Sequence, residues 1–320
     1  MGNSAAPVIL VCKQLEAGQE ERILAAAPRA RLVGEADLAA DPGLLGSIEV
    51  CYPSLPEHMW KGARRLRWLQ TSYAGMDSLL RILEARAHPA VFTNVHNHAS
   101  CMAEHLWGMA LMLTRNLHLA VRAQGEGRWD RESMIPGLST LAGRTLCVAG
   151  LGVIGTRCAE IGRAFGMHVT GISLHARSNG TVGEVVGPDQ RRAAFARSRI
   201  IMLVLPDTAL TRGFVGKAEL DSMQGAFLLN AGRGPSIDTD ALVNALRNGH
   251  VRGAGLDVTD PEPLPAGHPL WSMPNVVISP HYGGTHPGYD EETFEMFCRN
   301  LARYVAGEQL LNVVDKNAGY

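Results

Sequence analysis

Short apolar runs alternate along the chain with stretches whose apolar residues recur every three or four positions. The runs are bounded by polar and turn residues, which is typical of buried strands, whereas the recurring pattern is typical of helices packed on a sheet. Strands are therefore predicted at residues 8–12, 31–33, 47–52, 66–70, 91–94, 145–149, 168–173, 200–205, 226–230, 253–258 and 276–279. Helices are predicted at residues 19–27, 99–119, 154–165, 238–248 and 290–306, and a loop at 125–141. This alternation predicts an α/β protein with parallel sheets.

The stretch GRTLCVAGLGVIG, residues 143–155, gives the strongest local signal. A buried strand leads directly into Gly150, Gly152 and Gly155, and an amphipathic helix follows. In this context the first glycine permits a tight turn, the second lets the backbone approach a pyrophosphate, and the third lets the helix pack on the strand. The helix N-terminus adds free N–H groups for the phosphates. A glycine-rich turn without a ligand is the alternative, and the strand–turn–helix order favours a dinucleotide site.

Three later strands end beside residues that carry chemistry. One strand leads to Arg233, the next contains Asp257 and leads to Glu262, and the last leads to His281. Ligands of open parallel sheets lie beyond the carboxyl ends of the strands, so these side chains are expected near the glycine turn. A guanidinium fits a carboxylate, an imidazole exchanges a proton near neutral pH, and a neighbouring carboxylate favours the protonated imidazole. Taken singly, each residue is also typical of a loop anchor, a surface carboxylate or a loop histidine.

Two other features have competing interpretations. The turn at Ala74–Gly75 follows a strand and fits an anion with its backbone N–H groups, but an ordinary strand-to-helix loop has the same pattern. The helix at 99–119 is apolar on most sides, which indicates either deep burial or packing against a second subunit. His96, His98, Cys101 and His105 lie near its start, but their spacing matches no tetrahedral site, so no metal is expected.

Composition narrows the class of protein. The chain has 320 residues, enough for two domains, and a formal net charge of −1, which gives no reason to expect nucleic acid or an acidic membrane as partner. Its six cysteines are scattered and contain no C-x-x-C pair, which is typical of reduced thiols in the cytoplasm. No signal-peptide pattern and no membrane-length apolar run is present, so a cytoplasmic, soluble protein is expected.

The motifs taken together resemble one family. GLGVIG, NAGRG, GLDVTDPEPLP and NVVISPH, in this order and spacing, are similar to the D-isomer-specific 2-hydroxyacid dehydrogenases, and so are YAGMD and TNVHNHASCMAEH near the long helix. The resemblance implies a Rossmann-type doubly wound parallel-sheet domain, residues 99–286, inserted into a smaller flavodoxin-like α/β substrate domain, residues 1–98 and 287–320. It also implies an active site in the cleft and a homodimer through the helix near residues 99–119.

The resemblance also assigns roles to residues. The catalytic residues would be Arg233, which grips the substrate, His281, which moves the hydroxyl proton, and Glu262, which pairs with His281. The substrate-binding residues would be Ala74, Gly75, Arg233 and His281. The cofactor-binding residues would be Gly150, Gly152, Val153, Ile154, Gly155, Ser173, His175, Arg177, Leu205, Pro206, Thr211, Ala231, Asp257 and Gly283.

One departure from the family bears on the cofactor. Members that prefer NAD carry an acidic residue at the end of the second nucleotide-domain strand, where it accepts a hydrogen bond from the ribose 2′-OH. That position here is Ser173, with His175 and Arg177 nearby. A carboxylate would repel a 2′-phosphate, whereas these residues would accept one, so NADP is the expected cofactor. The alternative is that Arg177 points to solvent and NAD binds as well.

The expected activity is hydride transfer between NAD(P)H and a small 2-oxo acid, giving the D-2-hydroxy acid, with glyoxylate or hydroxypyruvate as first candidates. Formate dehydrogenase shares the architecture but has a glutamine as the partner of its histidine, and Glu262 argues against that activity. A dinucleotide-sensing interaction protein resembling the C-terminal-binding corepressors is the other alternative. It would bind dinucleotide and protein partners without turnover of any 2-oxo acid.

Overall fold

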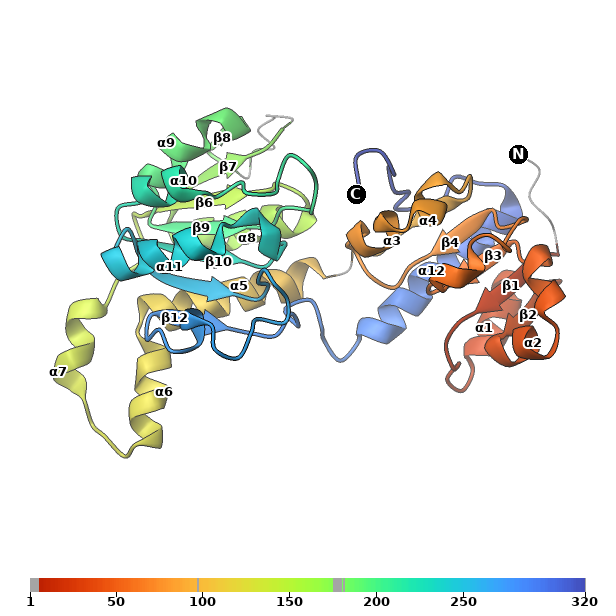
Figure 1. Ribbon diagram of the computed structural model, residues 1–320, viewed down its shortest axis with the longest axis horizontal. Coiled ribbons are helices and arrows are strands. Elements are labelled where there is room, and N and C mark those ends of the chain that lie inside the picture. Colours follow the sequence, from red (N-terminus) through yellow and green to blue (C-terminus); the bar gives the residue numbers. More distant parts are fainter. Residues whose placement is uncertain (1–5, 97, 175–179, 181, 320) are drawn as a thin grey trace. The chain divides into compact units, whose positions relative to one another are not determined.

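Strands and helices alternate along the chain in two units, each of which is built on its own parallel sheet (Figure 1). The computed structural model describes residues 6–96, 98–174, 180 and 182–319. Unit 1 combines the residues up to 97 with those from 286 onward, and unit 2 comprises residues 98–285. The predicted α/β class, with a Rossmann-type sheet inserted into a smaller flavodoxin-like one, is confirmed.

Unit 1 contains a five-stranded sheet in the order β2-β1-β3-β4-β5. All neighbouring strands are parallel, and this order is the flavodoxin-like one. Its apolar runs are short, and in β3 and β4 every residue is buried, as expected for strands covered on both faces. The strands are β1 (Val8–Val11), β2 (Arg31–Gly34), β3 (Val50–Tyr52), β4 (Trp68–Gln70) and β5 (Val91–Thr93).

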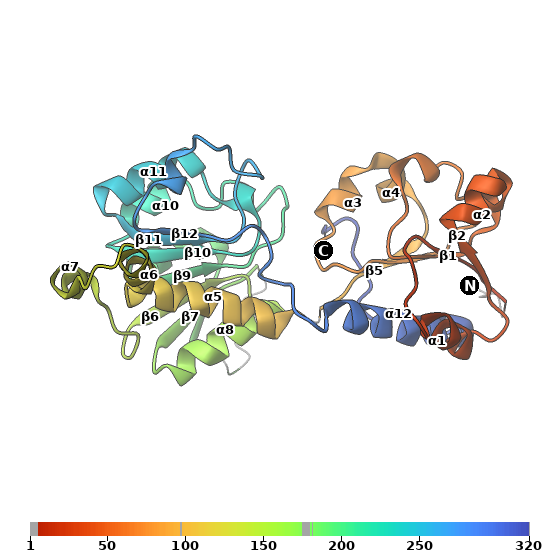
Figure 2. The same cartoon turned by 90° about the horizontal axis from the view of Figure 1, so that it is seen from below.

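Helices cover both faces of the unit 1 sheet (Figure 2). One face packs on α1 (Gln19–Ala26) and α12 (Tyr289–Ala306), and the other on α2 (Glu35–Ala40), α3 (Asp77–Arg81) and α4 (Leu83–Ala87). Although α12 is distant in sequence, Phe297 stacks on Tyr52 of β3, with ring centroids 4.5 Å apart, and on Trp68 of β4, at 5.6 Å. These aromatic contacts explain why the end of the chain belongs to unit 1.

The last residues of the chain lie against β5. Val314 donates its N–H to the carbonyl oxygen of Phe92 at 2.9 Å, and Val313 forms an antiparallel bridge with Thr93. Lys316 donates to the carbonyl oxygens of His88 and Ala90. The edge of the sheet is thereby covered, which removes a surface open to pairing with another chain.

Unit 2 contains a seven-stranded sheet in the order β12-β11-β10-β9-β6-β7-β8, and all neighbouring strands are again parallel. Six of these strands, read from β8, follow the order of a dinucleotide-binding Rossmann sheet. The short strand β8 was not predicted from the sequence. The strands are β6 (Thr145–Ala149), β7 (His168–Ile172), β8 (Glu184–Val186), β9 (Ile200–Leu203), β10 (Ala226–Asn230), β11 (Val251–Leu256) and β12 (Val276–Ile278).

Helices cover both faces of the unit 2 sheet (Figure 2), and an apolar layer lies between the sheet and the helices on each side. The helices α9 (Arg191–Ala196), α10 (Lys217–Ser222) and α11 (Thr239–Asn248) cover one face, and α5 (Ala99–Thr114) and α8 (Val153–Ala164) cover the other. The caps expected for α11 are present, because the Asp238 side chain accepts from the Ala241 N–H and Gly249 adopts a φ of 78°. Short 3₁₀ turns occur at Pro42–Ser47, Glu57–Met59, Ile135–Gly137, Pro188–Gln190, Gly234–Ser236 and Pro269–Trp271.

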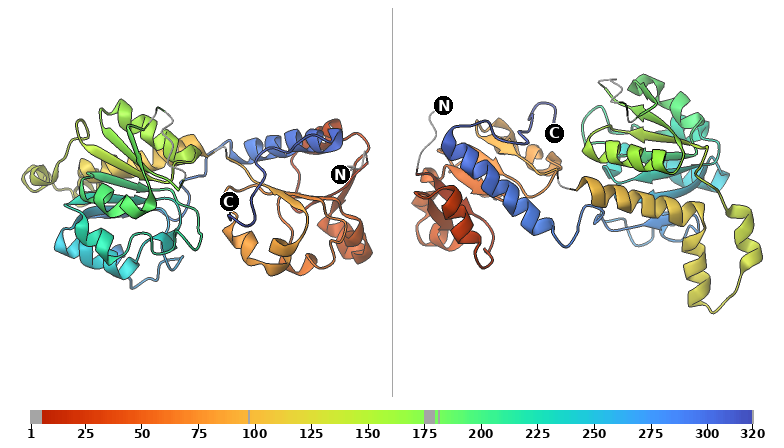
Figure 3. Two further views of the ribbon diagram at one scale, coloured as in Figure 1. Left: turned by 90° about the horizontal axis from the view of Figure 1, so that it is seen from above. Right: turned by 180° about the vertical axis from the view of Figure 1, so that it is seen from behind.

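The single helix predicted at 99–119 is wrong, because two helices occupy this region. Helix α5 ends at Thr114, and α6 (Leu117–Gly125) starts after Asn116, which adopts a left-handed φ of 55°. Asparagine tolerates this conformation, and here its side chain also donates to the Met134 carbonyl oxygen. The predicted loop at 125–141 contains the short helix α7 (Arg131–Met134). Figure 3 shows α6 and α7 projecting together from the rest of unit 2.

The predicted strand at 47–52 begins later than expected. A 3₁₀ turn continues through Ser47, and β3 starts only at Val50. The Asp41 side chain starts this turn by accepting from the Gly43 N–H, and Pro42 occupies its first position. Proline and the aspartate cap therefore extend the turn into residues that the apolar pattern alone assigned to the strand.

Candidate active site

The carboxyl ends of five strands meet at one edge of the unit 2 sheet. Strands β6, β9, β10, β11 and β12 are hydrogen-bonded in parallel, so the residues that follow them emerge on the same side. The glycine turn follows β6, and Leu205 follows β9. Arg233 follows β10, Asp257 is the residue after β11, and His281 follows β12. The sequence-predicted residues of unit 2 are therefore assembled by the topology of one sheet.

The glycine turn has two closed positions and one open position. A Cβ added to Gly150, whose φ is +97°, would lie 2.5 Å from the Val204 carbonyl oxygen. A Cβ on Gly155 would lie 1.8 Å from the carbonyl oxygen of Gly150, so α8 packs directly on the turn. At Gly152 an added Cβ would have no atom of the described residues within 4 Å, apart from those of its chain neighbours and the backbone of its own helix. The open backbone at the start of α8, with Val153 and Ile154 in its first turn, fits the pyrophosphate of a dinucleotide.

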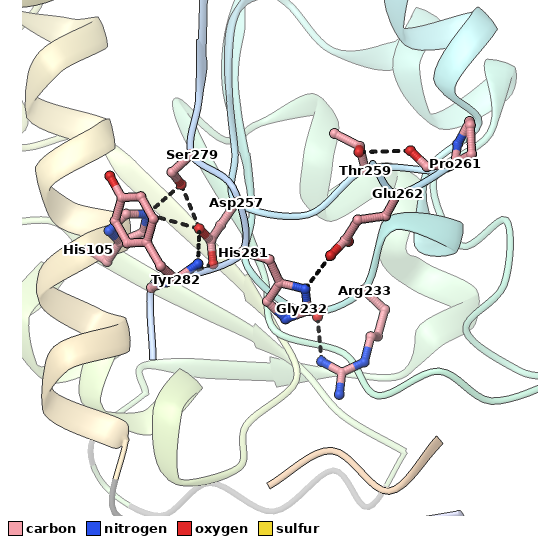
Figure 4. A network of polar contacts seen from close by, with 11 residues as sticks. His105, Gly232, Arg233, Asp257, Thr259, Pro261, Glu262, Ser279, His281 and Tyr282 are labelled. Carbon is pink, nitrogen blue, oxygen red and sulfur yellow. Dashed lines mark hydrogen bonds and ion pairs between the residues drawn. The ribbon is translucent and has the colours of Figure 1, made fainter. Parts of the chain in front are cut away.

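Arg233 lies on a loop that is held by the last residue of β10. The fully buried Asn230 donates to the Arg233 carbonyl oxygen at 3.0 Å and accepts from the Gly232 N–H at 3.0 Å. Ser236 also donates to the Arg233 carbonyl oxygen, at 2.7 Å. The Arg233 guanidinium donates to the Gly232 carbonyl oxygen at 2.8 Å (Figure 4). The backbone is thus fixed while the side chain remains partly exposed, which suits a group that binds an anion.

His281 and Glu262 are in direct contact. The Nδ1 atom of His281 lies 2.5 Å from Oε1 of Glu262, and the two side chains are 48% and 42% exposed (Figure 4). A carboxylate only accepts, so Nδ1 carries the proton and Nε2 is the ring nitrogen left to exchange a proton with a substrate. His281 adopts a left-handed φ of 52°. This conformation is uncommon for a residue with a side chain and here sets the direction of the imidazole.

Asp257 is a buried carboxylate that accepts several hydrogen bonds from the His281 loop. Its Oδ1 accepts from the Ser279 hydroxyl at 2.6 Å and from the Tyr282 N–H at 3.2 Å, and its Oδ2 accepts from the Gly283 N–H at 3.0 Å. His105 Nε2 lies 3.4 Å from Oδ1. Burial by itself raises the pKa of the Asp257 carboxyl, but these contacts outweigh it and hold the pKa below its usual value. The group is therefore an anion around neutral pH.

The other residues expected near a cofactor lie at the same sheet edge with differing surroundings. Ser173 directly follows β7, and its N–H donates to the Val186 carbonyl oxygen at 3.1 Å. Leu205 and Pro206 are half-buried after β9, and Ala231 is buried after β10. The Thr211 hydroxyl donates to the Pro206 carbonyl oxygen and so holds its own loop. His175 and Arg177 lie outside the described residues.

In unit 1, the turn containing Ala74 and Gly75 follows β4 and is tied by side chains. Thr71 donates its hydroxyl to the Tyr73 carbonyl oxygen at 3.0 Å, and Asn94 donates to that of Ala74 at 2.7 Å. The Tyr289 hydroxyl donates to the Ser72 carbonyl oxygen at 2.5 Å. Carbonyl oxygens of this turn are thus held by unit 1 itself, which fixes the backbone at Ala74 and Gly75.

Three residues that support this arrangement were not predicted as site residues. Asn230 stands within the NAGRG motif, and its position at a strand end was a signal that could have identified it. His105 and Ser279 lie on α5 and just after β12, and only the fold brings them together at Asp257. Among the described residues, no three His, Cys, Asp or Glu side chains are grouped to hold a metal ion.

Comparison with known proteins decides the family. Residues 107–283, more than half of the chain, match the model described as D-isomer specific 2-hydroxyacid dehydrogenase, NAD binding domain. The chain belongs to this family. The matched range contains the glycine turn, Arg233, Glu262 and His281, and in this dehydrogenase these residues occupy one sheet edge.

Relatives of this dehydrogenase and solved structures that resemble it agree with the assignment. A glyoxylate reductase of Aeropyrum pernix is 36% identical over 224 residues, which cover 67% of this chain and 66% of that protein. A family protein of Aeromonas salmonicida is 32% identical, with a TM-score of 0.82 over 97% of this chain and 99% of that one. An NADPH-dependent glyoxylate/hydroxypyruvate reductase of Sinorhizobium meliloti, solved with NADP and sulfate, is 26% identical, with a TM-score of 0.83 over 98% and 100%.

The dehydrogenase is thus an NAD(P)-dependent oxidoreductase of the 2-hydroxyacid class. In the part of the chain that the structure describes, none of the helices is both long enough and apolar enough to cross a membrane. All six cysteines are free thiols.

Proposed function

We propose that this enzyme reduces a small 2-oxo acid to the D-2-hydroxy acid and that NADPH is its preferred cofactor, with glyoxylate or hydroxypyruvate as the first candidate substrate. The observation that carries the proposal is the placement of Arg233 and of the His281–Glu262 pair at the sheet edge that also holds the glycine turn. In this proposal unit 2 binds the dinucleotide and unit 1 is the substrate domain.

Each side chain has a role that follows from its chemistry. The dinucleotide, when bound, supplies the hydride that reduces the carbonyl carbon. Arg233 binds the substrate carboxylate with its planar fork and stabilises negative charge on the carbonyl oxygen. His281 donates a proton from Nε2 to that oxygen, and Glu262 stabilises the charged imidazole that donates it. The backbone N–H groups of Ala74 and Gly75 remain predicted contacts of the substrate carboxylate.

The preference for NADPH rests on the end of β7. Ser173 occupies the position after this strand where an NAD-preferring sheet places a carboxylate, and a hydroxyl does not repel a 2′-phosphate. The Sinorhizobium meliloti relative named above was solved with NADP. The predicted contributions of His175 and Arg177 depend on residues outside the described part of the chain.

Initial rates test this proposal. Glyoxylate, hydroxypyruvate, pyruvate and phenylpyruvate are each supplied with NADPH and with NADH. We expect turnover with NADPH to exceed that with NADH by about tenfold or more in kcat/KM, a difference of about 1.4 kcal/mol. Ser173→Asp should reverse this preference because its carboxylate repels the 2′-phosphate. Equal rates with both cofactors would contradict the cofactor preference but not the reaction.

Arg233→Ala provides the second arm of the test. Removing the guanidinium should lower kcat/KM for 2-oxo acids about 100-fold or more, since charge-assisted hydrogen bonds to the reacting substrate are lost. Arg197→Ala, which removes an exposed guanidinium paired with the exposed Glu184 in the same unit, is the control and should retain activity. Binding of dinucleotide without turnover of any acid would instead favour a sensing protein on the same fold.

We also infer that the protein is a cytoplasmic homodimer. The free cysteines support a reducing compartment. Most apolar residues of α5, the helix that the sequence places at the interface, are buried inside unit 2, but Leu117 and Val121 lie exposed one turn apart on the projecting α6. An exposed apolar stripe on a projecting helix supports contact with a second copy through α6.

A further inference from the structure

Three polar side chains behind the His281 loop form a connected chain of hydrogen bonds. His105, from the first half of α5, places Nε2 2.8 Å from the Ser279 hydroxyl oxygen. That hydroxyl lies 2.6 Å from Oδ1 of Asp257. The Asp257 side chain is 1% exposed and that of His105 is 17% exposed, so water competes little for these contacts (Figure 4).

The direction of each hydrogen bond follows from the number of protons. Ser279 has one hydroxyl proton, and the Asp257 carboxylate can only accept, so Ser279 donates to Asp257. The Ser279 oxygen is then an acceptor toward His105, and Nε2 of His105 must carry a proton. His105 therefore donates to Ser279, which donates to Asp257, and each donor in the chain strengthens the next.

Asp257 in turn holds the loop that carries His281 through hydrogen bonds. The backbone N–H of His281 donates to the Asp257 carbonyl oxygen at 2.9 Å. The N–H groups of Tyr282 and Gly283, the next two residues, donate to the Asp257 carboxylate. Both the left-handed backbone of His281 and the direction of the chain beyond it are thus set by one buried aspartate.

His105 also closes over this loop by packing. A Cβ added to Gly283 would lie 2.9 Å from Cδ2 of His105 and 2.8 Å from Oδ2 of Asp257, so only glycine fits between the two side chains. The His105 ring meets the Tyr282 ring edge-on, with centroids 5.2 Å apart and planes at 75°. The imidazole thus contacts the loop both through its ring and through its hydrogen bond to Ser279.

We propose that His105 is a positioning residue for the reaction, which acts through Ser279 and Asp257 to hold His281 in the orientation that transfers the proton. The proposal rests on the proposed function for its effect on turnover. Without His105, the Ser279 oxygen loses its donor and Gly283 loses the ring that confines it. The loop then samples more conformations, and His281 is aligned for a smaller fraction of the time. Arg233 lies on a different loop, so substrate affinity is affected less than turnover.

Paired variants test the proposal. His105→Leu should lower kcat about 10- to 100-fold, the range expected when an acid–base group is misplaced. The KM for the 2-oxo acid should stay within about threefold of the wild type because binding by Arg233 is intact. His105→Gln, whose amide nitrogen lies near the position of Nε2, should recover a large part of kcat. His118→Leu is the matched control, because His118 is a buried histidine of the same unit whose Nδ1 lies 2.9 Å from the Met112 carbonyl oxygen, a contact that does not involve the His281 loop.

Hydrogen exchange of the peptide covering residues 280–284 gives a readout that does not depend on turnover. The amides of Tyr282 and Gly283 should exchange faster in His105→Leu than in the wild type and in His118→Leu. Unchanged exchange, or a kcat within about twofold of the wild type, would overturn the proposal. So would equal losses in the Gln and Leu variants. If the wild type turns over no 2-oxo acid, the proposed function fails, and faster exchange would still support the anchoring of His281 by His105.

Discussion

A histidine that donates a proton to a carbonyl oxygen must be charged before it reacts and correctly aimed when it does. In the proposed reaction the two requirements fall on different neighbours of His281. Glu262 contacts Nδ1 of His281 and would stabilise its charged form, whereas Asp257 holds the backbone from which the imidazole extends. The Glu262 contact is half exposed and the Asp257 contacts are buried, so the two effects should respond differently to substitution.

Glu262→Gln tests the role of charge at His281. The amide can still accept from Nδ1 but carries no charge to stabilise the positive ring, so kcat/KM for reduction should fall. Because the pair is nearly half exposed, we expect a fall of about fivefold or less, corresponding to about 1 kcal/mol or less. The measurement is kcat/KM for the 2-oxo acid at fixed pH and ionic strength.

Glu160→Gln is the control for that experiment. Glu160 is an exposed carboxylate of the same unit, paired with Arg157 on α8, and its replacement should leave kcat/KM unchanged. An unchanged kcat/KM in Glu262→Gln would show that the contact with His281 does not contribute to proton transfer.

At the scale of elements, the glycine turn contains glycines that are needed for two different reasons. Gly155 is required by packing, because any Cβ would collide with backbone of the turn. At Gly152, no described residue other than its chain neighbours comes within 4 Å of an added Cβ, so the described part of unit 2 gives no packing reason for glycine there. Close approach of a pyrophosphate would supply a reason.

Alanine variants distinguish these reasons. Gly155→Ala should lower the melting temperature by about 5 °C or more, since forcing an atom into packed backbone costs about 1–3 kcal/mol or more. Gly152→Ala should melt within about 1 °C of the wild type but bind NADPH about tenfold or more weakly. Circular dichroism melts and titrations of nicotinamide fluorescence measure the two effects.

Gly108→Ala is the reference for those variants. The Cβ that it adds on helix α5 has no neighbour within 4 Å among the described residues, its own helix backbone aside. This variant should therefore not lower the melting temperature and should not change the affinity for NADPH. Normal NADPH binding by Gly152→Ala would contradict the placement of the pyrophosphate at this turn.

Elements with strong local patterns could be predicted from the sequence. The apolar run Ala226–Asn230 is β10 as predicted, and the helix after Asp238 starts and ends where its caps indicated. In each case burial and hydrogen bonding within the element favour the same structure, so a short stretch of sequence is enough to predict it. The strand ends then place Arg233, Asp257 and His281 at one edge, because parallel strands share their direction.

Features that depend on distant residues could not be predicted in this way. The break at Asn116 interrupts a continuous apolar pattern, and the contact that holds its side chain comes from Met134 in the next segment. In the sequence, His105 is one of several histidines near the start of a predicted helix. Its partners in the structure follow β11 and β12, much later in the chain. Tertiary contacts of this kind override or add to local propensity.

At the scale of the whole molecule, the order of elements explains a discontinuous unit. The unit 1 sheet leaves one face that α1 alone does not cover, and α12 from the end of the chain completes it with Phe294, Phe297 and Leu301. The final residues then cover β5. Unit 1 is thus complete only after unit 2 has been synthesised, and its stability depends on both ends of the sequence.

The projecting pair α6 and α7 provides the test of assembly. On α6, Val121 is 62% exposed, and Trp129, in the segment that leads to α7, is 96% exposed. If a second copy covers this surface, Val121→Glu places a charge in an apolar interface and also loses the burial of a valine, worth about 1.5–3 kcal/mol. The dissociation constant of the dimer should then rise at least about 10-fold. Sedimentation velocity at micromolar concentrations should show wild type at twice the chain mass and the variant moving toward one chain mass.

Leu83→Glu is the control for the interface. It changes a side chain that is 76% exposed in unit 1 and should leave the mass of the assembly as in the wild type. A wild type that sediments as a single chain at every concentration would remove the homodimer from the proposal, and equal effects of the two variants would move the interface away from α6.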